Sequence, residues 1–154
     1  MNAIVNLGNK LLDAARTFAW LPPLFARLTV GYVFLTSGWG KIHHIEKVTG
    51  FFASLGLPAP SFHAHLVAYT EFIAGILILA GLATRLASIP LVIVMIVALR
   101  SAAFSEKLAG GFWEDYSALT FIPEYLYIVL LVWLIVAGPG KVALDTLIAR
   151  KYRR

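Results

Sequence analysis

The stretch WLPPLFARLTVGYVFLTSGW, residues 20–39, decides the fold, because it is apolar over about the 20 residues that a helix needs to cross a bilayer. Three more stretches of similar length and character follow at residues 62–83, 86–104 and 118–138. Their apolar residues are continuous and do not alternate with polar ones, which favours helices over strands. The sequence therefore predicts an all-α integral membrane protein, an antiparallel bundle of four transmembrane helices.

The composition supports the same class and excludes others. Of the 154 residues, 60% are hydrophobic and 14% are charged, which is more apolar and less charged than a soluble domain. We expect one domain, residues 1–154. The formal net charge of +5 comes from basic residues gathered at the ends of the stretches, so membrane orientation explains it and no nucleic-acid binding is expected. The chain has no cysteine, which excludes disulfide exchange and iron–sulfur ligation by its own residues.

Four ionisable residues lie within or at the ends of the apolar stretches, namely Arg27, Glu71, Arg100 and Glu124. A charge in lipid costs at least about 2–3 kcal/mol even on the most lenient scale. These side chains should therefore face the interior of the bundle, form pairs, or bind a ligand.

The first stretch places two cations and two glycines on one helical face, composed of Arg27, Gly31, Phe34, Gly38 and Lys41. Small residues on such a face allow a neighbouring helix to approach closely. The charged ends of the face and the glycines between them predict a tight contact with a second polar helix.

The second stretch and the turn after it repeat this pattern with Glu71, Gly75, Ile78, Leu82 and Arg85. If the first two helices run antiparallel, Arg27 and Glu71 lie at similar depths, and we predict that they pair. Two interpretations remain open. One is a buried ion pair that fixes the register of the helices, and the other is a polar pocket for a head group, an anion or a proton.

Further candidates lie at the opposite end of the bundle from the termini. Glu124 follows Pro123 at the start of the fourth helix, where a carboxylate complements the helix dipole, and alternatively it pairs with Lys41 or Arg100. Four histidines flank the same end, at positions 43, 44, 63 and 65. We interpret them as solvated, with His63 as the candidate for contact with a quinone head group, and we expect no metal site.

The connections also have readable features. Phe51, Phe52 and Leu55 share a face that predicts a short helix in the first loop, ended by Gly56 and by a Pro-Ala-Pro sequence at 58–60. Residues 1–19 have the spacing of a short interfacial helix. Residues 138–140, Gly-Pro-Gly, should end the fourth helix sharply.

The basic residues predict the orientation. Four spans place both termini on one side, which holds eight basic residues outside the membrane core, whereas the other side holds four. By the positive-inside rule both termini are cytoplasmic, and residues 141–154 form a basic cytoplasmic tail. In a bacterium the chain would lie in the inner membrane.

Taken in order along the chain, four groups of residues resemble the DoxX family of small four-helix bacterial and archaeal membrane proteins. They are Arg27-x3-Gly31-Tyr-x-Phe34-x3-Gly38-x2-Lys41-Ile, Phe51-Phe52-x2-Leu55-Gly56-Leu57-Pro58, Glu71-x3-Gly75-x5-Gly81-Leu82-x-Thr84-Arg85, and Gly138-Pro139-Gly140-Lys141-x3-Asp145.

The resemblance implies an antiparallel four-helix bundle and a connection with redox chemistry. The family takes its name from a membrane subunit associated with thiosulfate:quinone oxidoreduction, and other members are linked to redox stress and thiol handling. It implies no defined set of catalytic residues for this chain.

Two functions follow as expectations. The first is a membrane component of a quinone- or sulfur-linked redox system, with a quinone or a small anion as its ligand and a redox partner subunit. The candidate pocket residues are Arg27, Lys41, Glu71, Arg100, Glu124 and His63. The second is a non-enzymatic scaffold, lipid-binding protein or small-molecule carrier. Either one would contact the lipid bilayer, and the glycines leave a homo-oligomer open.

Overall fold

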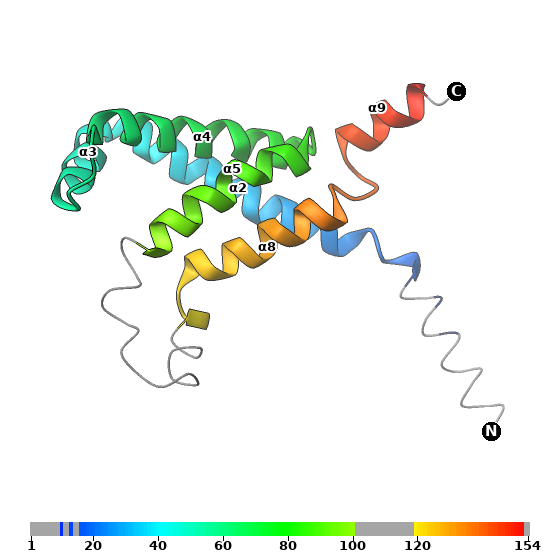
Figure 1. Ribbon diagram of the computed structural model, residues 1–154. Coiled ribbons are helices and arrows are strands. Elements are labelled where there is room, and N and C mark those ends of the chain that lie inside the picture. The colour runs from blue at the N-terminus through cyan, green and yellow to red at the C-terminus, as the bar shows by residue number, and fades with distance from the viewer. Residues whose placement is uncertain (1–9, 11–12, 14–15, 101–118, 153–154) are drawn as a thin grey trace.

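The computed structural model describes residues 10, 13, 16–100 and 119–152, and within them all regular structure is helical. Its helices are α2 (Leu21–His43), α3 (Ile45–Ser54), α4 (Pro60–Ala80), α5 (Thr84–Ala98), α8 (Pro123–Ala137) and α9 (Leu144–Tyr152) (Figure 1). Most of the predicted N-terminal interfacial helix lies outside the described residues, as do residues 101–104 and 118 of the third and fourth apolar stretches.

Five of these helices correspond to stretches that the sequence predicts, whereas α9 lies in the basic tail, for which no helix is predicted. The four apolar stretches overlap α2, α4, α5 and α8, and the short helix of the first loop is α3. Gly138, with φ of 81°, follows α8 directly, so the predicted end of the fourth helix is confirmed. The second apolar helix ends earlier than expected, because Gly81 adopts a left-handed conformation that the α4 backbone cannot continue through.

Among the described residues one helix, α4, is long and apolar enough to cross a membrane; it has 21 residues and a mean hydropathy of 1.5 over its best window. The helices α5 and α8 are apolar but shorter, with 15 residues each. Large apolar side chains also cover the outside of α2, α5 and α8. Tyr32, Leu86 and Val136 are 63%, 70% and 73% exposed. Such a surface is rare on soluble proteins and suits contact with lipid.

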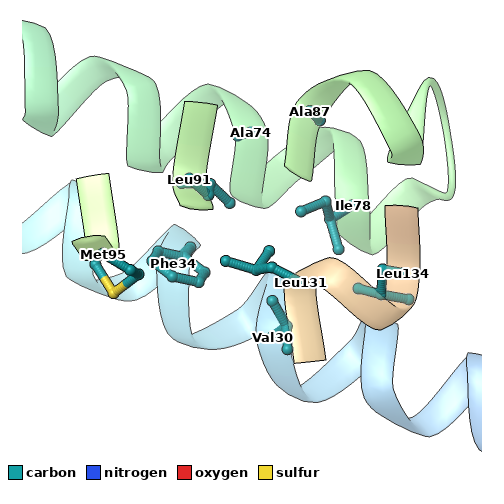
Figure 2. Packing of buried hydrophobic residues seen from close by; sticks show 9 residues of the cluster. All are labelled: Val30, Phe34, Ala74, Ile78, Ala87, Leu91, Met95, Leu131 and Leu134. Atoms are coloured by element: carbon teal, nitrogen blue, oxygen red, sulfur yellow. The ribbon is translucent and has the colours of Figure 1, made fainter. Parts of the chain in front are cut away.

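One core joins α2, α4, α5 and α8 (Figure 2). Phe34 and Leu131 are central to it and are 2% and 0% exposed. The buried cluster consists of Val30, Phe34, Ala74, Ile78, Ala87, Leu91, Met95, Leu131 and Leu134. Because α2 and α8 are separated by about half of the chain yet share this core, the four helices form a single packed unit.

The glycines of α2 and α4 allow the two helices to approach each other closely. A Cβ atom added to Gly38 would overlap the backbone of Phe72, and one added to Gly75 would overlap the backbone of Leu35. Gly31 lies in turn against Leu79. The order of these contacts shows that α2 and α4 run antiparallel, and it confirms the predicted role of the glycine-bearing face.

Candidate functional site

A polar cluster lies where the glycine-bearing faces of α2 and α4 meet, composed of Ser37, Lys41 and Glu71. The Ser37 hydroxyl donates a hydrogen bond of 2.9 Å to Oε2 of Glu71. Lys41 Nζ forms an ion pair with the same oxygen and donates a 3.0 Å hydrogen bond to Ser37 Oγ. Oε2 of Glu71 therefore accepts hydrogen bonds from both the Lys41 ammonium and the Ser37 hydroxyl.

The backbone geometry explains why this cluster forms. Ser37 and Lys41 are four residues apart and so project from the same side of α2. Gly38 lies between them in sequence and brings α2 against the backbone of α4 at Phe72, the residue after Glu71. The short interhelical distance allows side chains of modest length to meet.

Burial within the cluster is unequal. The side chain of Glu71 is 1% exposed, whereas that of Lys41 is 29% exposed. A carboxylate in a medium of low dielectric constant is costly unless it is paired, and the partly exposed ammonium offsets that cost. Lys41 thus connects the buried carboxylate of Glu71 with the surface of the bundle.

The predicted pair between Arg27 and Glu71 is wrong. Arg27 is buried, at 4% exposure, but its Nη1 donates a 3.2 Å hydrogen bond to the carbonyl oxygen of Pro139 and lies against Gly81. About 15 Å of helix axis separate the level of Gly81 from that of Glu71. The glycine contacts set the register so that Lys41 reaches Glu71, and Arg27 falls at the other end of α4.

Arg27 belongs to a second polar cluster, which joins the end of α8 to the turn between α4 and α5. The Asp145 carboxylate accepts hydrogen bonds from the backbone N–H groups of Ala83, at 2.9 Å, and Thr84, at 3.4 Å, and its charge acts on Arg27. Among the described residues, Nε of Arg27 and Oγ1 of Thr84 are buried without a hydrogen-bond partner.

The other predicted site residues remain apart from both clusters. Glu124 lies in the first turn of α8 and Arg100 is exposed. Within the described part of the chain no ion pair joins Glu124 to Lys41 or Arg100, so the alternative pairing of Glu124 is wrong. His63 uses Nδ1 in a 3.2 Å hydrogen bond with the carbonyl oxygen of Ala59 at the start of α4.

Sequence reasoning missed Ser37 and the role of Asp145. The spacing of Ser37 from Lys41, one helical turn, is the pattern that would have pointed to it. Asp145 entered only as part of the family resemblance, because nothing local indicates that its carboxylate caps a helix 61 residues away. Among the described residues no group of three or more His, Cys, Asp or Glu side chains has the arrangement of a metal site.

Comparison with known proteins places the chain among membrane proteins. It is 34% identical over 133 residues to the "Uncharacterized membrane protein Rv3486" of Mycobacterium tuberculosis, covering 81% of this chain and 80% of the relative. It is 33% identical over 96 residues to the "Putative oxidoreductase CatD" of Bacillus subtilis, covering 62% and 70%. It is 29% identical over 133 residues to the "Inner membrane protein YqjF" of Escherichia coli, covering 84% and 93%.

No solved structure matches the chain. The DoxX family profile matches residues 23–105, a segment that holds α2 from Pro23 onward, α3, α4 and α5, and the whole Ser37–Lys41–Glu71 cluster. The family match covers more than half of the chain. The relatives from Mycobacterium tuberculosis and Escherichia coli match 81% and 84% of it. The resemblance that the ordered motifs carry is thereby confirmed, and this chain is a membrane protein of the DoxX family.

Proposed function

We propose that this chain is a four-span protein of the bacterial inner membrane, with both termini in the cytoplasm, and that it serves as the membrane component of a redox system. The helices α2, α4, α5 and α8 would be the four spans. The greater number of basic residues on the side of the termini supports the orientation. The relatives named as an inner membrane protein and as a putative oxidoreductase support the location and the redox connection.

The observation that carries the redox role is the buried carboxylate of Glu71 beside Lys41 and Ser37. Two-electron reduction of a quinone to a quinol takes up two protons, and oxidation of the quinol releases them. A carboxylate that is shielded from lipid and connected to the surface through an ammonium can pass such protons. We assign the electrons to a partner subunit or to a bound sulfur compound, because the chain has no cysteine of its own.

The cluster also suits an anion. Lys41 retains 29% exposure, so its ammonium can meet a small sulfur oxyanion or a quinone carbonyl that enters from the same end of the bundle. His63 lies near the start of α4 at that end and is half-buried. The contact of Arg27 with Pro139 holds it away from this cluster, and we place it outside the ligand site.

The test is thermal stabilisation of the purified protein by a short-chain quinone analogue and, separately, by thiosulfate. Wild-type protein should melt at a higher temperature with one of these ligands. Lys41→Gln and Glu71→Gln should reduce the shift, whereas Lys47→Gln removes an exposed charge from α3 and should leave it unchanged. Absorbance of quinone that copurifies with gently solubilised protein gives a second, independent readout. Equal shifts for all four proteins, or no shift with any ligand, would count against the redox role.

A second candidate is a lipid-binding or carrier function without catalysis. The observation that favours it is a groove of about 420 Å³ between α4 and α5, which is almost wholly apolar and open along one side. Its walls include Phe62, Leu66, Tyr69, Ile73, Leu77 and Pro90. A copurified phospholipid or isoprenoid that Ile73→Trp displaces would support this function over the first, provided that quinone does not stabilise the protein.

A further inference from the structure

The last helix leaves an apolar face uncovered. On α9, Leu144, Leu147 and Ile148 are 43%, 57% and 46% exposed, and Val142 just before the helix is 52% exposed. The spacing of three and four residues puts the three helical residues on one side. These three residues form an apolar strip on α9, and Val142 adds a fourth exposed aliphatic side chain within seven residues; their exposure to water is costly.

The beginning of this segment is held firmly to the bundle. Ala143 is 4% exposed and lies against Gly81, and the backbone N–H of Asp145 donates a 3.0 Å hydrogen bond to the Gly81 carbonyl oxygen. The Asp145 carboxylate caps α5, and Thr146 donates through its hydroxyl to the carbonyl oxygen of Gly140 at 2.8 Å. The position of α9 at the end of the bundle is thus set by several contacts, while the remainder of the helix extends away from it (Figure 1).

The charges on the segment have one sign. Lys141, Arg150 and Lys151 are exposed, and the sequence continues with Arg153 and Arg154. The one acidic residue from 141 to 154 is Asp145, whose carboxylate is engaged at the start of α5. Arg85 lies at the same end of the bundle and donates to the carbonyl oxygen of Val136 at 3.2 Å. An apolar strip and a basic surface therefore occur on the same short helix.

We infer that α9 lies on the surface of the membrane at the end of the bundle that carries the α4–α5 turn, and that it binds anionic lipid head groups. Leu144, Leu147 and Ile148 enter the boundary between head groups and acyl chains. Lys151 lies on the same side of the helix, where its long side chain can extend to the phosphates, and Arg150 lies beside it. Charge complementarity selects anionic lipid over a neutral surface.

The strength expected of this contact follows from its charges. Each basic residue near an anionic leaflet shifts the bound-to-free ratio about fivefold at moderate ionic strength. Removal of both Arg150 and Lys151 should therefore lower that ratio about 25-fold. The apolar strip alone is short, so the charges decide whether the helix stays at the surface. The inference depends on the membrane nature of the chain and is independent of the redox role.

The absence of cysteine from the wild-type sequence allows a direct test in the full-length protein. Leu147→Cys, labelled with a polarity-sensitive fluorophore, reports on the apolar face, and Ala149→Cys reports on the opposite side of the same helix. Each labelled protein is placed, one copy per disc, in nanodiscs of phosphatidylcholine alone or mixed with phosphatidylglycerol. In the anionic discs the Leu147 probe should shift to shorter wavelength and resist quenching by iodide, and the Ala149 probe should remain open to quenching.

The variant Arg150→Gln/Lys151→Gln should abolish the shielding of the Leu147 probe, and Lys47→Gln, at the opposite end of the bundle, should keep it. Equal shielding in discs without anionic lipid would show that apolar burial alone holds α9, and would overturn the role of the charges. Shielding that occurs only when two copies share a disc would assign the face to a second copy instead. A Leu147 probe that is quenched freely in every disc would rule out membrane contact.

Discussion

Lys41 and Glu71 form an ion pair across the contact between α2 and α4, and the carboxylate is shielded while the ammonium is partly exposed. The pair lies at one end of the glycine-lined contact and Arg27, held by Pro139, at the other. The charges of the first two long helices are thus divided between two separate clusters. The two clusters therefore predict different effects of substitution on the stability of the protein.

Removal of Lys41 should be costly because it leaves a buried carboxylate without its ammonium. We expect Lys41→Met to lower the free energy of unfolding by about 2 kcal/mol, less than for a fully buried pair because Lys41 is partly exposed. The double variant with Glu71→Leu should lose less than the sum of the single changes. Denaturation in mixed micelles measures this cycle. Strictly additive losses would show that the two side chains do not interact.

A methyl group at Gly38 should force α2 and α4 apart. The added Cβ would overlap the Phe72 backbone, which cannot move aside as a side chain can, so we expect Gly38→Ala to cost at least about 2 kcal/mol. The matched control is Gly40→Ala, two residues along the same helix, where nothing lies within 4 Å of the new atom. There the helical preference of alanine should leave stability unchanged or raise it by up to about 1 kcal/mol. If both variants melt alike, the close contact does not exist.

The separation of the two clusters predicts which pairs of changes are independent. Arg27→Gln and Glu71→Gln should have additive effects within about 0.5 kcal/mol, because the residues share no partner. Arg27→Gln and Asp145→Asn should not be additive, because the Asp145 charge acts on Arg27. Both double-mutant cycles are measured from the melting temperatures of the single and double variants. Non-additive effects of Arg27→Gln and Glu71→Gln would show that the two side chains interact, contrary to the observed register of α2 and α4.

The sequence predicts the helices and their inner faces well, because both depend on local periodicity. The face from Arg27 to Lys41 and the glycine contact with Gly75 follow from spacing alone. The partner of each charge could not be predicted in the same way, because it depends on how far one helix slides along the other. A shift of a few residues decides whether Glu71 meets Lys41 or Arg27, and that shift is set by the glycine contacts.

The capping of α5 by Asp145 cannot be predicted from the pattern of neighbouring residues. The carboxylate and the N–H groups of Ala83 and Thr84 are more than 60 residues apart in sequence and meet only after α8 has packed. A single sequence carries no spacing rule for such a contact. The same holds for the hydrogen bond from Arg27 to Pro139.

The orientation of the chain gives the last prediction. If the positive-inside rule decides it, a reporter fused after Arg154 should be active only when it is of the cytoplasmic type, and one inserted near Leu55, beyond α3, only when it is of the periplasmic type. Replacing Arg85, Lys141, Arg150 and Lys151 by glutamine should weaken this preference, because these four cations belong to the more basic side. Changing Lys41 and Lys47 to glutamine should strengthen it. A periplasmic signal from the Arg154 fusion of the unaltered chain would reverse the arrangement, and it would place Lys41 and Glu71 at the cytoplasmic end of the bundle.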